Sequence, residues 1–150
     1  MVTGWGSSTP IHFHNSTSSD SRAYSKKLQQ LEVPIKQNKT CQNSLKKRGE
    51  DPRHYTERMF CAGYSKRSRG PCFGDSGGPV VREIITPVGG ANSTEVISRW
   101  VQIGIVSNTI SGCAVKGVYT FYTHVPFMMN WIDGVLQGIH TPSERQIYFV

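Results

Sequence analysis

A chain of 150 residues is long enough to form one domain with a single core, and this one carries a formal net charge of +7. Its hydrophobic fraction of 37%, with 15 glycines and 8 prolines, is typical of a turn-rich globular domain and excludes a disordered chain. No apolar run approaches the roughly 18 residues that a membrane-spanning helix needs, so we expect no membrane association.

Most of the predicted elements are short strands, and one helix follows them. In chain order the strands are expected at residues 2–6, 28–35, 59–63, 78–85 and 96–106. A hairpin loop, TPVGGANS, joins the last two, and residues 40–48 fit one or two helical turns. Apolar residues at four-residue spacing then predict an amphipathic helix over 125–138. This succession indicates an all-β fold, an antiparallel β-barrel with a C-terminal helix.

Four cysteines and three glycosylation patterns bear on the compartment. The cysteines are Cys41, Cys61, Cys72 and Cys113, and the acceptor asparagines are Asn15, Asn38 and Asn92. Two disulfides and attached glycans are typical of a secreted protein, and the first residues contain no secretory signal. The cysteines lack paired Cys-x-x-Cys spacing and no histidine lies near them, so we expect no metal. No cofactor is expected either.

Positive charge is concentrated in two runs, Lys46-Lys47-Arg48 and Lys66-Arg67 with Arg69. A solvated loop is the favoured interpretation of such runs, and a surface that binds a polyanion is the alternative. Base-reading motifs and aromatic side chains interleaved with the charge are absent, so we expect no nucleic-acid partner.

The segment PCFGDSGGPVV, residues 71–81, surrounds Ser76 with three glycines, an aspartate and two prolines. Glycines are needed where the backbone takes positive φ or another group approaches closely. A serine on such a turn has its hydroxyl directed outward, as a nucleophile requires. A tight turn between strands is the plainer explanation of an isolated Gly-Ser-Gly, but the longer string GDSGGP is much rarer.

Five segments resemble, in order, the second barrel of the chymotrypsin-fold serine endopeptidases. They are VTGWG at 2–6, MFCAGY at 59–64, GDSGGPVV at 74–81, GIVS at 104–107 and FYTHV…NWI at 121–132. The resemblance implies a six-stranded Greek-key barrel with a C-terminal helix over residues 1–138, the second half of a double barrel. Residues 139–150 form a tail without an assigned role.

The resemblance also implies roles for residues. Ser76 would be the nucleophile that attacks a polypeptide substrate, and the backbone N–H groups of Gly74 and Ser76 would form the oxyanion hole. Asp75 would be the activation switch, which pairs in active members with a newly released amino terminus. Cys41 would pair with Cys61, and Cys72 with Cys113.

The family's catalytic histidine and aspartate lie in a first barrel that precedes the VTGWG strand. The histidines of this chain are His12, His14, His54, His124 and His140, and none has the alanine-alanine-histidine-cysteine context of the catalytic one. We therefore expect the missing N-terminal barrel as a partner and no measurable turnover by this chain alone. The alternatives are a non-catalytic binding module and a first barrel supplied by a separate chain.

Selectivity in this family is set by a pocket beside the serine. Gly70 stands where members that cut after Lys or Arg carry an aspartate, which disfavours basic substrates. The repeat VYTFYT offers two registers for one wall, and we choose the one that places Tyr122 nine residues from both Cys113 and Trp131. The pocket positions are then Gly70, Ser107, Asn108, Thr109 and Thr120. Two threonines in place of glycines predict selectivity for small aliphatic side chains such as Ala or Val, with a degenerate pocket as the competitor.

Overall fold

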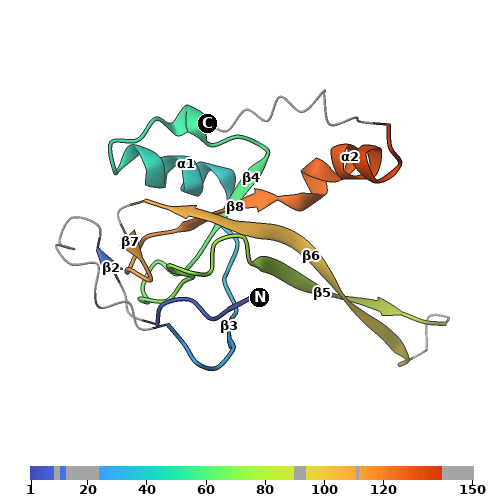
Figure 1. Ribbon diagram of the computed structural model, residues 1–150. Helices are drawn as coiled ribbons and strands as arrows, with labels where there is room; N and C mark the ends of the chain where they lie inside the picture. The colour runs from blue at the N-terminus through green and yellow to red at the C-terminus, as the bar shows by residue number, and fades with distance from the viewer. Residues whose placement is uncertain (9–10, 13–23, 90–93, 111, 140–150) are drawn as a thin grey trace.

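The computed structural model describes residues 1–8, 11–12, 24–89, 94–110 and 112–139 (Figure 1). Two of the predicted glycosylation sites, Asn15 and Asn92, lie outside these residues. So do His14, His140 and residues 140–150, which make up nearly all of the predicted tail.

The main element is a six-stranded antiparallel sheet in the order β3-β1-β5-β6-β8-β4. Its strands are β1 (Val2–Gly4), β3 (Gln29–Leu31), β4 (Met59–Ala62), β5 (Pro79–Pro87), β6 (Val96–Thr109) and β8 (Thr120–His124). A separate two-stranded ladder pairs β2 (Ile11–His12) with β7 (Gly112–Cys113). The helices are α1 (Asn38–Lys46), the 3-10 turn η1 (Pro52–His54) and α2 (Val125–Leu136).

The two ends of the sheet are joined by the segment that follows β3. Ile35 forms an antiparallel bridge with Ala62 in β4. On either side of that bridge, the Lys36 N–H donates to the Cys61 carbonyl at 2.9 Å and the Gly63 N–H donates to the Pro34 carbonyl at 3.1 Å. Because β3 and β4 are the two edge strands, these bonds close the sheet on itself. The fold is therefore the barrel half with a C-terminal helix that the sequence predicts.

Two apolar clusters make up the core. The first fills the barrel with residues from five strands and consists of Val2, Phe60, Ala62, Val80, Val106 and Tyr122. The second lies under α1 and consists of Cys41, Leu45, Tyr55, Cys61 and Phe121. Neighbouring strand residues such as Cys61 and Phe60 belong to different clusters, because side chains alternate between the two faces of a strand.

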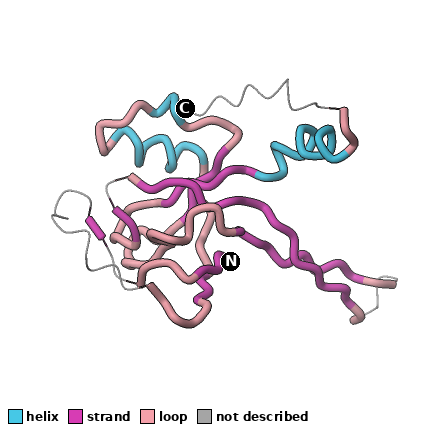
Figure 2. The backbone as a smooth tube through the Cα atoms, in the orientation of Figure 1, coloured by secondary structure: helices cyan, strands magenta, loops and turns pink. Residues whose placement is uncertain are grey.

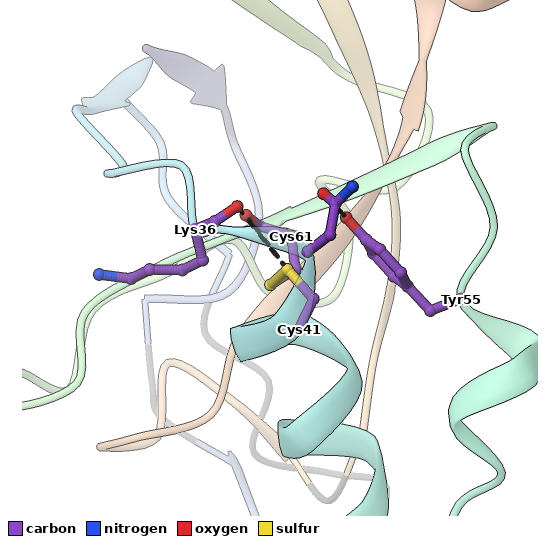
Figure 3. Close-up of a disulfide and its surroundings, with 5 residues drawn as sticks. Lys36, Cys41, Tyr55 and Cys61 are labelled. Atoms are coloured by element: carbon purple, nitrogen blue, oxygen red, sulfur yellow. Dashed lines mark hydrogen bonds between the residues drawn. A yellow bond between two sulfur atoms is a disulfide. The ribbon is translucent and has the colours of Figure 1, made fainter.

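Helix α1 is attached to the barrel by a disulfide and a hydrogen bond. Its buried residues are Cys41, Ser44 and Leu45, which share one face at helical spacing. Cys41 is bonded to Cys61 in β4, with 5.8 Å between the Cα atoms (Figure 3). At the start of the helix the Tyr55 hydroxyl donates to Asn38 Oδ1 at 2.9 Å. The pairing implied by the resemblance thus connects α1 to the strand that carries the MFCAGY motif.

Strands β5 and β6 continue beyond the barrel as a two-stranded arm, visible at the lower right of Figure 2. Their pairing runs from Pro79 opposite Ile105 to Pro87 opposite Val96. Several large apolar side chains of the arm are exposed, namely Ile85, Val96, Ile97 and Trp100. Both strands are longer than the sequence predicts, since the polar and charged residues between the apolar ones conceal the alternation.

Other elements differ in their bounds from the expectation. Strand β3 ends at Leu31, and Pro34 lacks the N–H that a continued ladder would need. Helix α1 begins at Asn38, two residues earlier than expected, and α2 ends at Leu136 ahead of Gly138, whose φ is +73°. The ladder β2–β7 and the turn η1 are too short to leave a periodic pattern. None of the helices described is long and apolar enough to cross a membrane.

Candidate active site

Ser76 lies on a backbone loop that hydrogen bonds hold on both sides. The Asp75 N–H donates to the Cys72 carbonyl at 3.0 Å, and the Gly78 N–H donates to the Asp75 carbonyl at 3.0 Å. Directly after the serine, the Gly77 N–H donates to the Val106 carbonyl of β6 at 2.9 Å. Ser76 itself is exposed. The loop therefore presents the serine at the surface while both of its flanks are fixed to the barrel.

Two glycines of the loop have backbone conformations that side chains disfavour. Gly74 has a φ of +91° and Gly77 a φ of +81°. At Gly77 an added Cβ would meet no atom within 4 Å, so the conformation alone requires glycine there. At Gly74 an added Cβ would also lie 2.9 Å from the Tyr24 ring, so close packing adds to the requirement.

Asp75 points away from the serine and into the loop that carries VTGWG. Its Oδ1 accepts from the Gly6 N–H at 2.9 Å, and its Oδ2 accepts from the Cys72 N–H at 3.0 Å. An added Cβ would stand 2.0 Å from the Asp75 carboxylate at Gly4 and 2.4 Å from it at Gly6. The two glycines of the motif therefore make room for this carboxylate, which backbone amides satisfy.

The two N–H groups expected to bind an oxyanion have no acceptor within the described parts of the chain. Neither the Gly74 nor the Ser76 backbone N–H donates to a described residue, while the intervening Asp75 N–H does. Both residues are exposed. Two unengaged donors on either side of the Asp75 peptide are the chemical requirement for stabilising a negatively charged oxygen near the Ser76 hydroxyl.

A cavity of about 90 Å³ opens beside Ser76. Its lining residues are Pro71, Cys72, Phe73, Ser76, Val106, Ser107, Asn108, Thr109, Cys113 and Thr120. Cys72 and Cys113 form the second disulfide, which joins the serine loop to the far wall. Four of the five predicted pocket positions thus lie around one cavity with the serine.

Gly70, the fifth position, does not line this cavity. An added Cβ at Gly70 would lie 3.7 Å from Thr120 Oγ1, so Gly70 stands behind the Thr120 side chain. Thr120 is buried and faces Thr109 across the β6–β8 ladder, and the Thr109 hydroxyl donates to the Gly112 carbonyl at 2.7 Å. The two threonines therefore stand together in the cavity wall, and none of the lining residues is charged.

The cavity takes its shape from an irregularity in β6. The register between β6 and β8 shifts between Val106 and Asn108, which leaves Ser107 without a partner in the ladder. The Asn108 side chain turns back, and its Oδ1 accepts from the Thr109 N–H at 2.7 Å. Sequence reasoning found these positions but not Pro71, Phe73 and Val106, which also line the cavity and belong to the same motifs.

Tyr122 in β8 is a further residue that the motifs do not assign. Its side chain is fully buried, and its hydroxyl has no hydrogen-bond partner among the described residues. Burial raises the pKa of the Tyr122 hydroxyl, and the negative charge of Asp75 acts in the same direction. The Thr120 side chain lowers that pKa because it lies near the hydroxyl, without the geometry of a hydrogen bond. Burial in the core of the barrel therefore favours the neutral phenol of Tyr122.

No histidine whose side chain the structure describes lies with Ser76. His54 is exposed in η1, and His124 Nδ1 lies 3.3 Å from the Glu57 carbonyl while its ring packs edge-on against Phe60. Neither lines a cavity that contains Ser76. The Ser76 hydroxyl has no hydrogen-bond partner within the described ranges. These ranges also contain no cluster of three or more His, Cys, Asp or Glu side chains able to hold a metal.

The remaining glycosylation site that the structure describes is Asn38, the first residue of α1. It is exposed, and only its Oδ1 is engaged, by the Tyr55 hydroxyl.

Comparison with known proteins places the chain in a family. A family model described as trypsin matches residues 1–132. The chain therefore belongs to the trypsin family of chymotrypsin-like serine proteases. Similar proteins include "Clotting factor C" of Tachypleus tridentatus and "Limulus clotting factor C" of Carcinoscorpius rotundicauda. Each is 35% identical to the chain over 133 residues, which are 88% of this chain and 11% of the relative.

Proposed function

We propose that the chain is the serine-bearing half of a secreted serine endopeptidase and that Ser76 is the nucleophile. The observation that carries this proposal is the arrangement of the loop: an exposed serine, two unengaged backbone N–H donors and an adjacent pocket. In the reaction, Ser76 Oγ attacks the scissile carbonyl, and the Gly74 and Ser76 N–H groups bind the oxygen that becomes negative. The peptide bond breaks to give an acyl-enzyme, which water hydrolyses.

The proton of the Ser76 hydroxyl needs an acceptor that the described residues do not offer. A family histidine with its aspartate would come from a preceding barrel, which is the partner we propose for this chain. Helix α2 supports that partner, because Phe127 and Trp131 are 42% and 49% exposed and Leu136 is 78% exposed. A patch of large apolar side chains on a helix is typical of a surface that another part of the protein covers.

Asp75 is proposed as the residue that couples this loop to activation. In the present structure the backbone amides of Gly6 and Cys72 hold its carboxylate. A released amino terminus would have to compete with these two bonds for the carboxylate. Exchange of one set of partners for the other would move the Asp75 peptide, and with it the N–H groups on either side.

The pocket is proposed to prefer small aliphatic residues. Its volume of about 90 Å³, the two threonines and the absence of a charged residue among its lining support Ala or Val over Lys or Phe. Product peptides test this without turnover, since their carboxylate occupies the oxyanion site. N-acetyl tripeptides ending in Val, Phe or Lys are titrated against the chain while the backbone resonances of Thr109 and Thr120 are followed. The Val peptide should shift them at the lowest concentration, and a Lys peptide that binds best would contradict the proposed selectivity.

The second candidate is a non-catalytic homologue that uses the barrel to bind a partner. The narrowed pocket, with Asn108, Thr109 and Thr120 in its wall, favours this function if no peptide occupies it. Incubation of the 150-residue chain with peptide substrates should give no turnover under either hypothesis, since the base is missing. Binding of the tripeptide acid that is lost with the C-terminal amide of the same peptide, which offers no negative oxygen to the Gly74 and Ser76 N–H groups, would support the protease half over the binding module.

A further inference from the structure

Another cavity, which Ser76 does not line, lies between the end of α1 and the segment before β8. Its volume is about 220 Å³. Its lining residues are Thr40, Asn43, Ser44, Lys47, Arg48, Gly117 and Tyr119. None of them lines either cavity that contains Ser76. We call this cavity the basic cleft, because both of its charged lining residues are cations and Lys116 directly precedes Gly117.

Fixed contacts position the cations around the basic cleft. Arg48 Nη2 donates to the Gly117 carbonyl at 3.0 Å, so the half-buried guanidinium spans from α1 to the opposite wall. Lys36 Nζ lies 5.6 Å from the centroid of the Tyr119 ring, within the range of a cation–π contact. Two cations from different segments are therefore directed to the same wall by contacts that the fold provides.

These cations have no acidic partner among the described residues. The single ion pair in that part of the chain joins Arg53 to Asp51 on the neighbouring turn. Lys46 in the last turn of α1 stabilises the helix through its dipole, which accounts for that charge. The helix dipole does not account for Arg48, which donates to the Gly117 carbonyl, or for Lys36, which lies over the Tyr119 ring. It does not account for the exposed Lys116 either. A surplus of positive charge at a concave surface raises the local concentration of anions.

The neutral lining completes an anion site. Thr40, Asn43 and Ser44 bring hydroxyl and amide groups to the same cavity, and these groups donate hydrogen bonds to anionic oxygens. We propose that the basic cleft binds a sulfated polysaccharide. Sulfate esters match its mixture of cations and neutral donors, and a chain of them can contact Lys47 and Lys116 together. Nucleic acid is a poorer match, because single-stranded bases need aromatic rings to stack on. Tyr119 is the one aromatic residue of the lining, and the Lys36 ammonium lies over its ring.

The second basic run of the sequence provides a matched control. Lys66 and Arg67 are exposed, and the Arg67 guanidinium lies over the Tyr64 ring at 5.4 Å. Neither residue lines the basic cleft. The double variants Lys47→Gln/Lys116→Gln and Lys66→Gln/Arg67→Gln therefore lower the net charge equally and alter only exposed side chains. Only the first pair lies at the basic cleft, since Lys47 lines it and Lys116 directly precedes the lining residue Gly117.

The test measures binding of the 150-residue chain to a heparin octasaccharide at several salt concentrations. The Lys47→Gln/Lys116→Gln variant should lose affinity on the order of tenfold and reduce the slope of log K against log salt by about two. The control variant should keep the wild-type slope, and Lys47→Arg/Lys116→Arg should keep the affinity. Circular dichroism confirms that each variant is folded.

Three results would overturn the proposal. Absence of octasaccharide binding excludes the ligand class. Equal losses in both glutamine variants mean that net charge alone attracts the polyanion. Full displacement of the octasaccharide by millimolar inorganic sulfate at constant ionic strength means that the cleft takes single small anions and not a polysaccharide.

Discussion

At the scale of single residues, the serine loop is organised around the Asp75 carboxylate. Its two oxygens accept from the Gly6 and Cys72 amides, and Gly4 and Gly6 lack the Cβ atoms that would occupy its place. Ser76, the next residue, is exposed, so the contacts of Asp75 inside the loop fix the position of the serine at the surface. The chemistry proposed for Ser76 therefore depends on a neighbour that does not touch the substrate.

Replacement of Asp75 by Asn tests that dependence. Asn keeps the shape but offers one acceptor oxygen, so its amide group would face an N–H donor in place of the lost oxygen. The free energy of unfolding should fall by about 1–3 kcal/mol, measured by urea denaturation. Asp133→Asn on the exposed surface of α2 removes the same charge, and an equal loss in that control would contradict the assigned role.

For Tyr122 we predict that removal of a polar group does not lower the free energy of unfolding. Its buried hydroxyl has no described partner, whereas the Tyr55 hydroxyl donates to Asn38 Oδ1. Tyr122→Phe should therefore leave thermal stability unchanged or raise it, and Tyr55→Phe should cost about 1 kcal/mol.

Because burial raises the pKa of Tyr122, the folded state holds its proton at a pH where the unfolded state releases it. Stability should fall as the pH rises above about 10, and less so in Tyr122→Phe.

A loss of stability in Tyr122→Phe as large as that in Tyr55→Phe would show that the Tyr122 hydroxyl has a partner, such as a bound water.

The family resemblance placed Thr109 after the GIVS strand, and the spacing of Tyr122 from Cys113 and Trp131 placed Thr120, and both threonines line the cavity beside Ser76. Their role in selectivity stays a prediction. The partners of Asp75 were not predictable in the same way. Gly6 and Asp75 are 69 residues apart, and no local pattern records that the glycines of VTGWG surround a carboxylate. The orphaned hydroxyl of Tyr122 is also a property of the packed barrel and not of its strand.

At the scale of elements, β6 connects most of the site. It pairs with β5 on one edge and β8 on the other, and its register shift near Ser107 forms the pocket wall. Alternating apolar residues predicted β5 and β6 but placed their ends too early. Strand β5 continues to Pro87 on a two-stranded ribbon where Ile85 and Ile97 are exposed, and β6 continues past its register shift to Thr109.

The Cys41–Cys61 disulfide is predicted to hold α1 on the barrel. Few residues of α1 are buried, and the bond closes a loop with a sequence separation of 20. The double variant Cys41→Ala/Cys61→Ala should lose about 3 kcal/mol of unfolding free energy in a denaturant titration. Amides of Ser44 and Leu45 should also exchange faster than those of Val80 and Val106. Unchanged protection at Leu45 would show that apolar packing alone retains the helix.

At the scale of the whole molecule, one barrel brings together the groups that the proposed acyl transfer would use. It holds the exposed Ser76, two unengaged backbone N–H groups beside it, and a cavity that the Cys72–Cys113 disulfide lines. Trypsin-family motifs made the fold of this half predictable, and the roles of its site residues stay predictions. The base is the remaining requirement, and α2 exposes the apolar side chains that a further barrel would cover.

The most direct test of the account is active-site labelling of the native protein from its source with a fluorophosphonate, which reacts only with an activated serine. The same sample is deglycosylated, and its intact mass and labelled peptide are determined. We predict a label on Ser76 in a protein well above the 16.7 kDa of this chain, because we propose that the base comes from a preceding barrel. A native protein near 16.7 kDa without label at Ser76 would contradict the account and identify the barrel as a binding module.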